Sequence, residues 1–465
     1  MLFSGISFLY YFLPLTLAVY FAVPKGGKNA VLLLASLVFY GWGEPKYVLL
    51  MGLSIVLGYG FGLLVEKYRE GKAGRILCTI SVTITLSFLL CFKYADFFLG
   101  NFNAVTGLGM PLLRLALPIG ISFYTFQIIS YTVDVYRGEA AQRNLIRLAA
   151  YVAMFPQLIA GPIVRYSNIS GQLADREHSF HEAALGIRRF VIGLAKKILL
   201  ANQLGELCAT FRASEEKSVL FYWMYAVSFT LHIYFDFSGY SDMAVGLGRI
   251  FGFRFPENFH YPYISTSITE FWRRWHISLG TWFRDYVYIP LGGNRKGRGR
   301  QLINILIVWM LTGFWHGAAW NFILWGLYFA AILTAEKLWL LKGLEKSRLL
   351  SRIYTLLLVM MSFVIFNGES LEQVFSDLAG LVGAGGIPFV SAEAVYALQS
   401  FGVLLLAGGI GATPAVFILA KRISGNPAGG RFLNLIEPVG LAGLMLVMTA
   451  YLVDGSFNPF LYFRF

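Results

Sequence analysis

Apolar residues recur along this chain in runs that are long enough to cross a membrane. A spanning helix needs roughly 20 mostly apolar residues to cross about 30 Å of hydrocarbon. The pattern therefore predicts an all-α polytopic membrane protein, with eleven or twelve tilted transmembrane helices and additional re-entrant or in-plane helices. The predicted spans are 6–23, 30–43, 47–65, 76–98, 113–136, 187–211, 218–236, 301–317, 319–336, 353–367, 396–420 and 433–453.

Three segments depart from this simple pattern. Residues 148–164 are apolar but contain Pro156, Gly161 and Pro162, which predicts a re-entrant or in-plane segment. Residues 237–300 are polar and broken by Gly and Pro, which predicts short helices lying against the cytoplasmic leaflet. Residues 368–395 carry acidic side chains among apolar ones, so either an interfacial amphipathic helix or an ordinary connecting loop is expected there.

The first apolar run, 6–23, is interpreted as a retained span. No basic residue precedes it and no small-residue cleavage site is clear, so it does not resemble a signal peptide. The composition agrees with a membrane protein, because 57% of the 465 residues are hydrophobic and only 14% are charged. The three cysteines show neither metal-ligand spacing nor an obvious disulfide partner.

The basic residues predict the orientation in the membrane. Lys and Arg concentrate in cytoplasmic loops, and an outside N-terminus would place 32 of the 38 in cytoplasmic segments. Those segments are 24–30, 66–75, 137–197, 237–300, 337–352 and 421–431. Both termini are therefore expected outside. The same distribution explains the net charge of +13 without nucleic acid, and the lipid bilayer is the expected environment.

Two histidines are the candidates for catalysis. His316 lies near the end of the run that starts at Leu302, which places it about 21 Å along a helix axis and past the membrane midplane. An ionisable side chain at that depth is costly, so it suggests a functional site, although a packing histidine bonded to a carbonyl is the alternative. His276 lies among tryptophans and arginines that also fit an interfacial aromatic belt.

Other side chains around these histidines are candidates for donor binding or for lining a tunnel. Arg295 and the basic residues that follow it could hold phosphates, or they could form a solvated loop. Asp236 and Tyr240 follow an apolar run, and we expect Asp236 to pair structurally with Arg273 or Arg274. The complete set is Trp272, Arg273, Arg274, Trp275, Trp282, Arg284, Asp285, Asn294, Arg295, Trp315, Asp236 and Tyr240.

Familiar motifs of soluble enzymes do not occur in the sequence. We find no HEXXH zinc site, no GxSxG nucleophile elbow, no Walker loop and no His-x4-Asp acyltransferase box. Neither a metal nor a permanently bound cofactor is therefore expected. A channel or transporter would carry polar residues along several spans, whereas this sequence concentrates them in one loop and one span.

Long motifs resemble the membrane-bound O-acyltransferase family, in particular its bacterial alginate O-acetylation branch. They are the stretches 236–244, 271–279, 282–286, 288–295 and 314–317, with 154–163 and the C-terminal 458–465 also similar. The resemblance covers essentially the whole chain. By motif, His316 matches the family's catalytic histidine and His276 matches the second histidine of the bacterial branch.

The resemblance implies a ring of helices around a tunnel through the bacterial cytoplasmic membrane. It implies a single domain, with N-terminal helices in 1–136, a catalytic core in 137–320 and C-terminal helices in 321–465. A cytoplasmic thioester, acetyl-CoA, would donate an acetyl group for an extracytoplasmic polysaccharide or peptidoglycan, by way of a separate secreted acetyltransferase. The alternative is a D-alanyl transferase of the teichoic-acid type, which would take its acyl group from a carrier protein.

Overall fold

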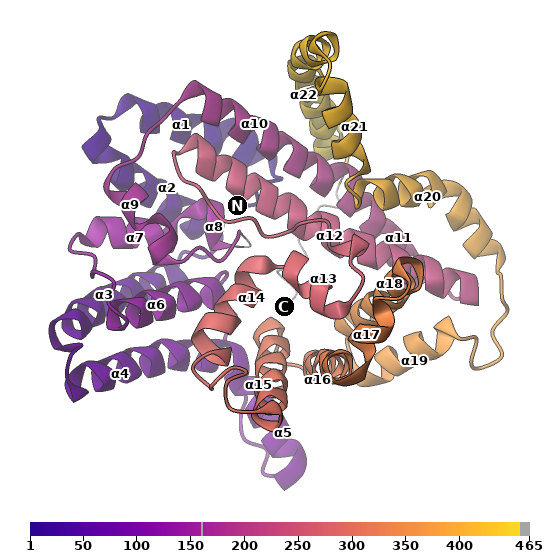
Figure 1. The fold of residues 1–465 in the computed structure, drawn as a ribbon, viewed down its shortest axis with the longest axis horizontal. Coiled ribbons are helices and arrows are strands. Elements are labelled where there is room, and N and C mark those ends of the chain that lie inside the picture. The colour runs from indigo at the N-terminus through magenta and orange to yellow at the C-terminus, as the bar shows by residue number, and fades with distance from the viewer. Residues whose placement is uncertain (160, 456–465) are drawn as a thin grey trace. The chain divides into compact units, whose positions relative to one another are not determined.

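The computed structural model describes residues 1–159 and 161–455, and this part of the chain is helical without any strand. Its packing divides it into two compact units (Figure 1). Unit 1 contains Met1–Phe190 with Ser241–Pro256, and unit 2 contains Val191–Tyr240 with the described residues from Glu257 onward. Helices α10 and α12 contribute residues to both units.

Unit 1 is built from the N-terminal helices. They are η1 (Phe8–Phe12), α1 (Leu13–Ala22), η2 (Lys25–Gly27), α2 (Lys28–Gly41), α3 (Tyr47–Tyr68), α4 (Lys72–Leu89), η3 (Leu90–Tyr94), α5 (Ala95–Thr106), α6 (Ile121–Tyr136), α7 (Leu145–Ala153), α8 (Phe155–Leu158), α9 (Tyr166–Ala174) and most of α10 (Phe180–Ala195). Helices α3, α4 and α6 pack on one another (Figure 1). Gly58 allows α3 to approach α6 closely, because a Cβ there would lie 3.0 Å from Ile128.

Unit 2 holds the remaining helices. They are η4 (Lys196–Asn202), α11 (Gln203–Ala213), α12 (Val219–Ile250), η5 (Pro262–Ile264), α13 (Ile268–Arg274), α14 (Ile277–Phe283), η6 (Arg284–Tyr288), α15 (Arg298–His316), α16 (Trp320–Ala335), η7 (Glu336–Leu340), α17 (Leu341–Leu344), α18 (Arg348–Asn367), α19 (Leu371–Leu381), α20 (Ala392–Gly411), α21 (Ala415–Ser424) and α22 (Pro427–Asp454). The last helices of the chain, α21 and α22, lie side by side (Figure 1).

The prediction of a multi-pass membrane protein is confirmed. Among the described residues, six helices are long and apolar enough to cross a membrane. They are Tyr47–Tyr68, Lys72–Thr106, Trp320–Leu344, Arg348–Asn367, Ala392–Gly411 and Pro427–Asp454. A shorter apolar helix covers Phe8–Ala22, inside the first predicted span.

The prediction of short helices in 237–300 is confirmed for residues 262–288, which contain η5, α13, α14 and η6, but the residues directly after 236 were interpreted wrongly. We expected short helices there, but α12 continues to Ile250. Its carboxylates have partners on the preceding helical stretch: within unit 2 Asp236 pairs with Lys197 at 2.5 Å, and within unit 1 Asp242 pairs with Arg189 at 2.8 Å. Because ion pairs neutralise these two carboxylates, the polar residues do not mark the end of the helix.

Three predicted spans have different limits. Residues 113–120 are not helical, and α6 begins only at Ile121. The span 187–211 is part of a continuous helical stretch from α10 to α11, so Arg188, Arg189, Lys196 and Lys197 are helical residues and not members of a loop. The span 396–420 is interrupted, since α20 ends at Gly411 and α21 starts after Pro414, which cannot donate a helical hydrogen bond.

The two segments with uncertain assignments contain helices. Residues 148–159 are buried and include most of α7 and all of α8. The segment 368–395 contains α19, which resolves the choice between helix and loop for residues 371–381. The C-terminal residues 458–465, whose motif contributed to the family resemblance, lie outside the described part, and so does the predicted outside C-terminus.

A close helix contact in unit 2 yields a test of the fold. A Cβ at Gly239 of α12 would lie 2.7 Å from the Gly193 carbonyl oxygen, whereas a Cβ at Gly409 of α20 would meet no atom within 4 Å. Gly239→Ala should therefore lower the free energy of unfolding by about 1–3 kcal/mol through overpacking. Gly409→Ala should be neutral or stabilising by up to about 1 kcal/mol. Thermal unfolding in detergent would measure both, and equal stability of the two variants would contradict this packing.

Candidate functional site

His276 lies at a sharp reversal of the chain between two short helices. It connects α13 to α14 with φ 44° and ψ 51°, in the left-handed region that few non-glycine residues adopt. Its side chain is only 2% exposed, and the ring meets Phe237 edge to face with centroids 4.7 Å apart. Backbone conformations of this kind occur often at functional sites, where the surrounding structure must hold them.

Asn258 holds this reversal and fixes the protonation of the imidazole. Its Oδ1 accepts hydrogen bonds from the Ser278 backbone N–H at 3.2 Å and from the Ser278 hydroxyl at 2.9 Å, and it lies 3.1 Å from Nδ1 of His276. A backbone N–H is always a donor, so the Asn258 atom that faces it is the oxygen. Nδ1 of His276 therefore carries the proton, and Nε2 carries the lone pair.

The buried position also decides the charge of His276. Burial lowers the pKa of His276 to about 3, because the interior disfavours the imidazolium form. The ring is therefore neutral at physiological pH. It can accept a hydrogen bond through Nε2, but its basicity is low.

Glu336 positions the helix that leads into this reversal, a role that the sequence analysis missed. The carboxylate is fully buried and accepts hydrogen bonds from the Ile268 N–H at 2.6 Å and the Thr269 N–H at 2.8 Å. These are the first two residues of α13, so Glu336 satisfies N–H groups that have no partner inside the helix. A carboxylate at a helix N-terminus is also favoured by the helix dipole.

His316 is the last residue of α15, at the opposite end from the basic residues Arg298 and Arg300. The helix has 19 residues, so His316 lies about 27 Å along its axis from Arg298. The His316 side chain is half-buried, and its ring meets Trp325 and Phe366 with centroids 5.2 Å away in each case. The neighbouring Gly313 packs against the backbone of α16, which leaves no room for a larger side chain.

Trp315 brings the two histidines into one neighbourhood. Its indole lies 6.1 Å from the His276 ring and 5.0 Å from the His316 ring, measured between centroids. The two histidines, which are 40 positions apart in the sequence, therefore both contact the same buried side chain. Trp325, which the sequence analysis also missed, adds an indole N–H that is buried and has no hydrogen-bond partner among the described residues.

Tryptophan and phenylalanine side chains form one wall of this neighbourhood. Trp272 of α13 meets Trp309 at 4.6 Å and Phe329 at 4.9 Å, and Trp325 continues the cluster to His316. The predicted site residue Trp272 is therefore linked to His316 through aromatic contacts. Such a wall keeps water away from the imidazole.

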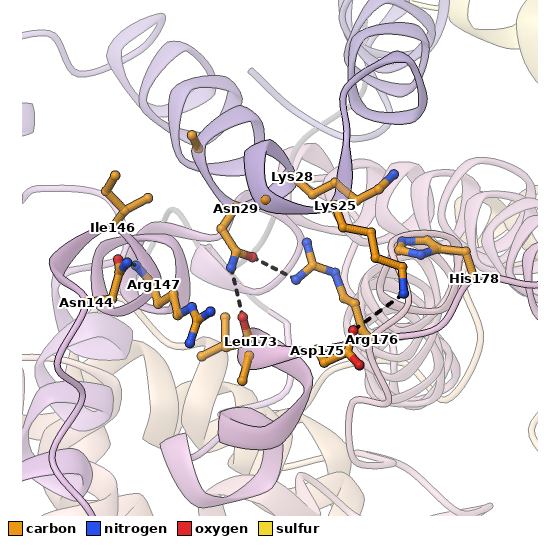
Figure 2. A pocket seen from close by; sticks show the side chains of 13 residues that line it. Lys25, Lys28, Asn29, Asn144, Ile146, Arg147, Leu173, Asp175, Arg176 and His178 are labelled. Carbon is orange, nitrogen blue, oxygen red and sulfur yellow. Dashed lines mark hydrogen bonds and ion pairs between the residues drawn. The ribbon is translucent and has the colours of Figure 1, made fainter.

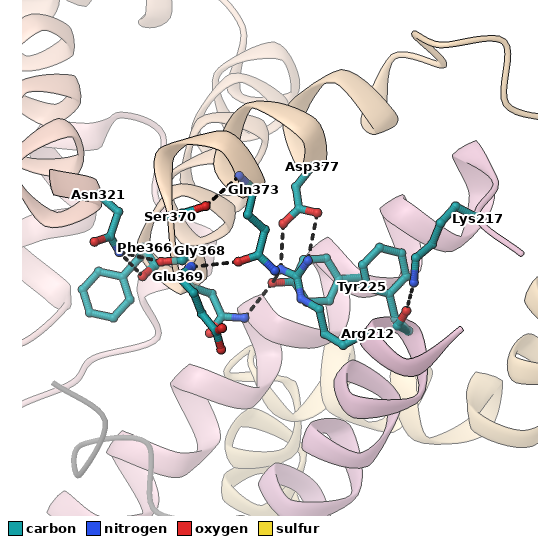
Figure 3. Close-up of polar contacts among 12 residues, drawn as sticks. Arg212, Lys217, Tyr225, Asn321, Phe366, Gly368, Glu369, Ser370, Gln373 and Asp377 are labelled. Atoms are coloured by element: carbon teal, nitrogen blue, oxygen red, sulfur yellow. Dashed lines mark hydrogen bonds and ion pairs between the residues drawn. The ribbon is translucent and has the colours of Figure 1, made fainter. Parts of the chain in front are cut away.

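Figure 3 shows polar contacts around the end of α18, which carries Phe366. Asn321 donates hydrogen bonds to the carbonyl oxygens of Phe366 at 3.1 Å and Gly368 at 2.9 Å, and so holds the end of α18 that carries Phe366. Nearby, Arg212 makes a bidentate ion pair with the buried Asp377 at 2.9 and 2.7 Å. Arg212 and Asp377 belong to segments that the charge distribution predicts to be outside.

Asp236 was predicted to pair with a basic residue of the 270s. Asp236 does pair structurally, as expected, but the predicted partners Arg273 and Arg274 are wrong. Its partner is Lys197, while Arg274 pairs with Glu270 at 2.9 Å and Arg273 is exposed. The sequence did not indicate this partner because Lys197 precedes Asp236 by 39 residues, with α11 between them.

Most of the other aromatic candidates are buried, and the loop candidates are exposed. Trp275, Trp282 and Tyr240 are packed in the interior. Arg284 pairs with the adjacent Asp285 at 2.7 Å. Asn294, Arg295 and the residues up to Arg300 are all exposed.

Comparison with known proteins decides the family. The model described as the membrane-bound O-acyltransferase family matches residues 121–372, which include both histidines, Asn258 and Glu336. The chain belongs to the membrane-bound O-acyltransferase family. It is therefore an O-acyltransferase, and its resemblance to the alginate O-acetylation branch is confirmed.

Similar proteins in this acyltransferase family act on different polymers. The probable alginate O-acetylase of Azotobacter vinelandii is 38% identical over 500 residues, covering 100% of both chains. The peptidoglycan O-acetyltransferase of Helicobacter pylori is 34% identical and covers 83% of this chain and 81% of that protein. The teichoic acid D-alanyltransferase of Bacillus subtilis is 30% identical and covers 55% of this chain and 70% of that protein.

The hydrogen bonds of Asn258 give a test of the candidate site. Asn258→Ala would leave the His276 ring N–H and two Ser278 donors without their acceptor, and a buried unsatisfied group costs about 1–3 kcal/mol. We expect a clear fall in the thermal unfolding midpoint. Ser278→Ala removes only the hydroxyl bond and should cost less. If Asn258→Ala is no more destabilised than Ser278→Ala, then Asn258 does not hold the reversal.

Proposed function

We propose that this enzyme moves an acetyl group from a cytoplasmic thioester, acetyl-CoA, across the bacterial cytoplasmic membrane for O-acetylation of an extracytoplasmic polysaccharide or peptidoglycan. A separate secreted acetyltransferase would complete transfer to the polymer. The full-length similarity to a probable alginate O-acetylase supports this assignment, as does the similarity to a peptidoglycan O-acetyltransferase. The observation that most supports this chemistry is that the rings of His276 and His316 both contact Trp315.

His316 is the proposed general base. It takes the proton from the acceptor hydroxyl while the oxygen attacks the thioester carbonyl, the carbon–sulfur bond breaks, and the thiolate leaves and takes up a proton. His316 suits this role because it is half-buried beside an aromatic wall, where a hydroxyl can reach it and hydrolysis by bulk water is restricted. The indole N–H of Trp325 is a candidate donor to the oxyanion that forms during the attack.

His276 is proposed to orient the thioester and not to move protons. A pKa of about 3 lies far below the operating pH, and a general base works best when the two are close. The Asn258 contact fixes the orientation of the His276 ring. A ring held in one orientation selects one arrangement of the donor, which lowers the entropic cost of reaction.

The basic loop is proposed as the place where the donor arrives. Arg295, Lys296, Arg298 and Arg300 are exposed at the end of α15 that the distribution of basic residues predicts to be cytoplasmic, with the N-terminus outside. Guanidinium and ammonium groups there suit the pyrophosphate of a nucleotide-bearing thioester. The donor would then extend toward His316 at the other end of the same helix.

D-alanyl transfer is the alternative within the same chemistry. The D-alanyltransferase of Bacillus subtilis covers only 55% of this chain, whereas the probable alginate O-acetylase covers 100%. The whole-length match therefore favours acetyl transfer. The two functions differ in the mass of the transferred group, so one experiment separates them.

Mass spectrometry of cell-envelope glycans tests the proposed function. A strain without this gene should lose O-acetyl groups from one envelope polymer, and the wild-type gene should restore them. His316→Gln keeps hydrogen-bonding capacity but cannot take a proton, so transfer should fall by about a hundredfold or more. His316→Ala should insert normally and be equally poor.

His232 supplies the matched control. It lies in the same unit, buried in α12, with Nδ1 2.7 Å from the Ala201 carbonyl oxygen and its ring stacked on Phe229. His232→Gln should retain most of the transfer activity. Unchanged glycans in the deletion strain would reject the proposed acceptor class, and normal transfer by His316→Gln would reject the general base. Loss of D-alanyl groups in place of acetyl groups would establish the alternative.

A further inference from the structure

Unit 1 contains a basic pocket, shown in Figure 2. Its volume is about 190 Å³, and residues from four segments of the chain line it: 25–30, 144–147, 173–176 and His178. The lining includes four cationic side chains, Lys25, Lys28, Arg147 and Arg176, against the single carboxylate of Asp175. None of these residues was a candidate site in the sequence, where they are scattered over 150 positions.

Arg176 is the most informative residue of the pocket. Its side chain is only 9% exposed, and Nε donates to the Tyr20 hydroxyl at 2.9 Å and to the Phe251 carbonyl oxygen at 3.0 Å. Nη1 donates to Asn29 Oδ1 at 2.7 Å, as Figure 2 shows. The guanidinium is thus fixed in place before any ligand binds.

The third nitrogen of Arg176 has no partner. Nη2 is buried and makes no hydrogen bond within the described residues, although it carries two N–H donors. A buried donor without an acceptor costs about 1–3 kcal/mol, so such a donor is usually completed by water, an ion or a ligand. The missing partner must be an acceptor, and beside this many cations it is most favourable as an anion.

Two helix N-termini add to the positive potential. Lys28, Asn29 and Ala30 form the first turn of α2, which has no side-chain cap, although the Lys28 N–H is bonded to the Lys25 carbonyl oxygen. Ile146 and Arg147 belong to the first turn of α7, where Asn144 Oδ1 accepts the Arg147 N–H. The dipoles of both helices favour an anion at these ends. In addition, burial together with the charges of Lys28 and Arg176 lowers the pKa of His178, which agrees with a cationic environment.

We propose that this pocket binds a phosphate group. Its volume of about 190 Å³ is enough for a phosphate and some water. Pockets that enclose drug-sized ligands measure about 300–1,000 Å³, so a whole nucleotide or an acyl chain would remain outside. The ligand is either the phosphate of an anionic phospholipid or that of a soluble compound, reached from the side that the basic residues predict to be cytoplasmic.

Binding to the purified full-length chain tests this site independently of acyl transfer. The first arm titrates inorganic phosphate in detergent at constant ionic strength and follows binding by calorimetry. The second arm uses native mass spectrometry to measure phosphatidylglycerol retained from nanodiscs of mainly zwitterionic lipid. Lys25→Gln with Arg147→Gln removes two cations without touching the Arg176 network, and the Lys25–Asp175 pair is too exposed to matter for folding.

A second double variant is the matched control. Lys72 and Arg75 are exposed basic residues of unit 1 outside the pocket, so Lys72→Gln with Arg75→Gln removes the same charge elsewhere. The pocket variant should bind the retained probe at least about tenfold more weakly, since charged hydrogen bonds are lost, while the control should match the wild type.

The two arms identify the source of the phosphate. Selective retention of phosphatidylglycerol that inorganic phosphate competes away would assign the pocket to lipid. Saturable phosphate binding without lipid retention would assign it to a soluble phosphate compound. The proposal is overturned if neither probe binds the wild type, or if the pocket variant binds as well as the control.

Discussion

Polar groups buried in this protein must find their partners inside it, because hydrocarbon offers none, and this constraint organises both units. Lys197 neutralises Asp236 and lets α12 continue through a polar stretch. Arg212 forms an ion pair with the buried Asp377 of α19. At the site itself the same constraint places the Asn258 oxygen against three donors, one of them on His276. The pairing that permits burial is therefore also what orients the imidazole.

The two histidines differ because their surroundings differ. His276 is buried, neutral and held in one tautomer at a left-handed backbone position, so it is rigid before substrate binds. His316 is half-buried at a helix end, where a substrate hydroxyl can approach it. These differences suit the roles proposed for the two histidines in acyl transfer, since the donor must be positioned while the nucleophile loses a proton. The aromatic residues around Trp325 separate this chemistry from water.

The sequence predicted the features that depend on local composition. Apolar runs indicated the membrane helices, and the depth of His316 in its helix singled it out. Prediction from the sequence failed where the partner of a polar residue is distant in the sequence. Lys197, Asn258 and Glu336 carry no local signal, because an amide or a charge beside apolar residues looks the same whether it ends a helix or pairs across the fold. Arg176 and the basic pocket escaped notice for the same reason, since only folding gathers their residues.

The most direct test of this account is the protonation of His276, because its role follows from a fixed neutral tautomer. Nitrogen-15 NMR of the histidine-labelled protein, assigned with His276→Gln, reports the state of each ring nitrogen. The account predicts a neutral ring with a protonated Nδ1 and an unprotonated Nε2, unchanged between pH 8 and pH 5, since burial lowers the pKa to about 3. A ring that titrates near its ordinary pKa of about 6.5 would contradict it, and so would the opposite tautomer.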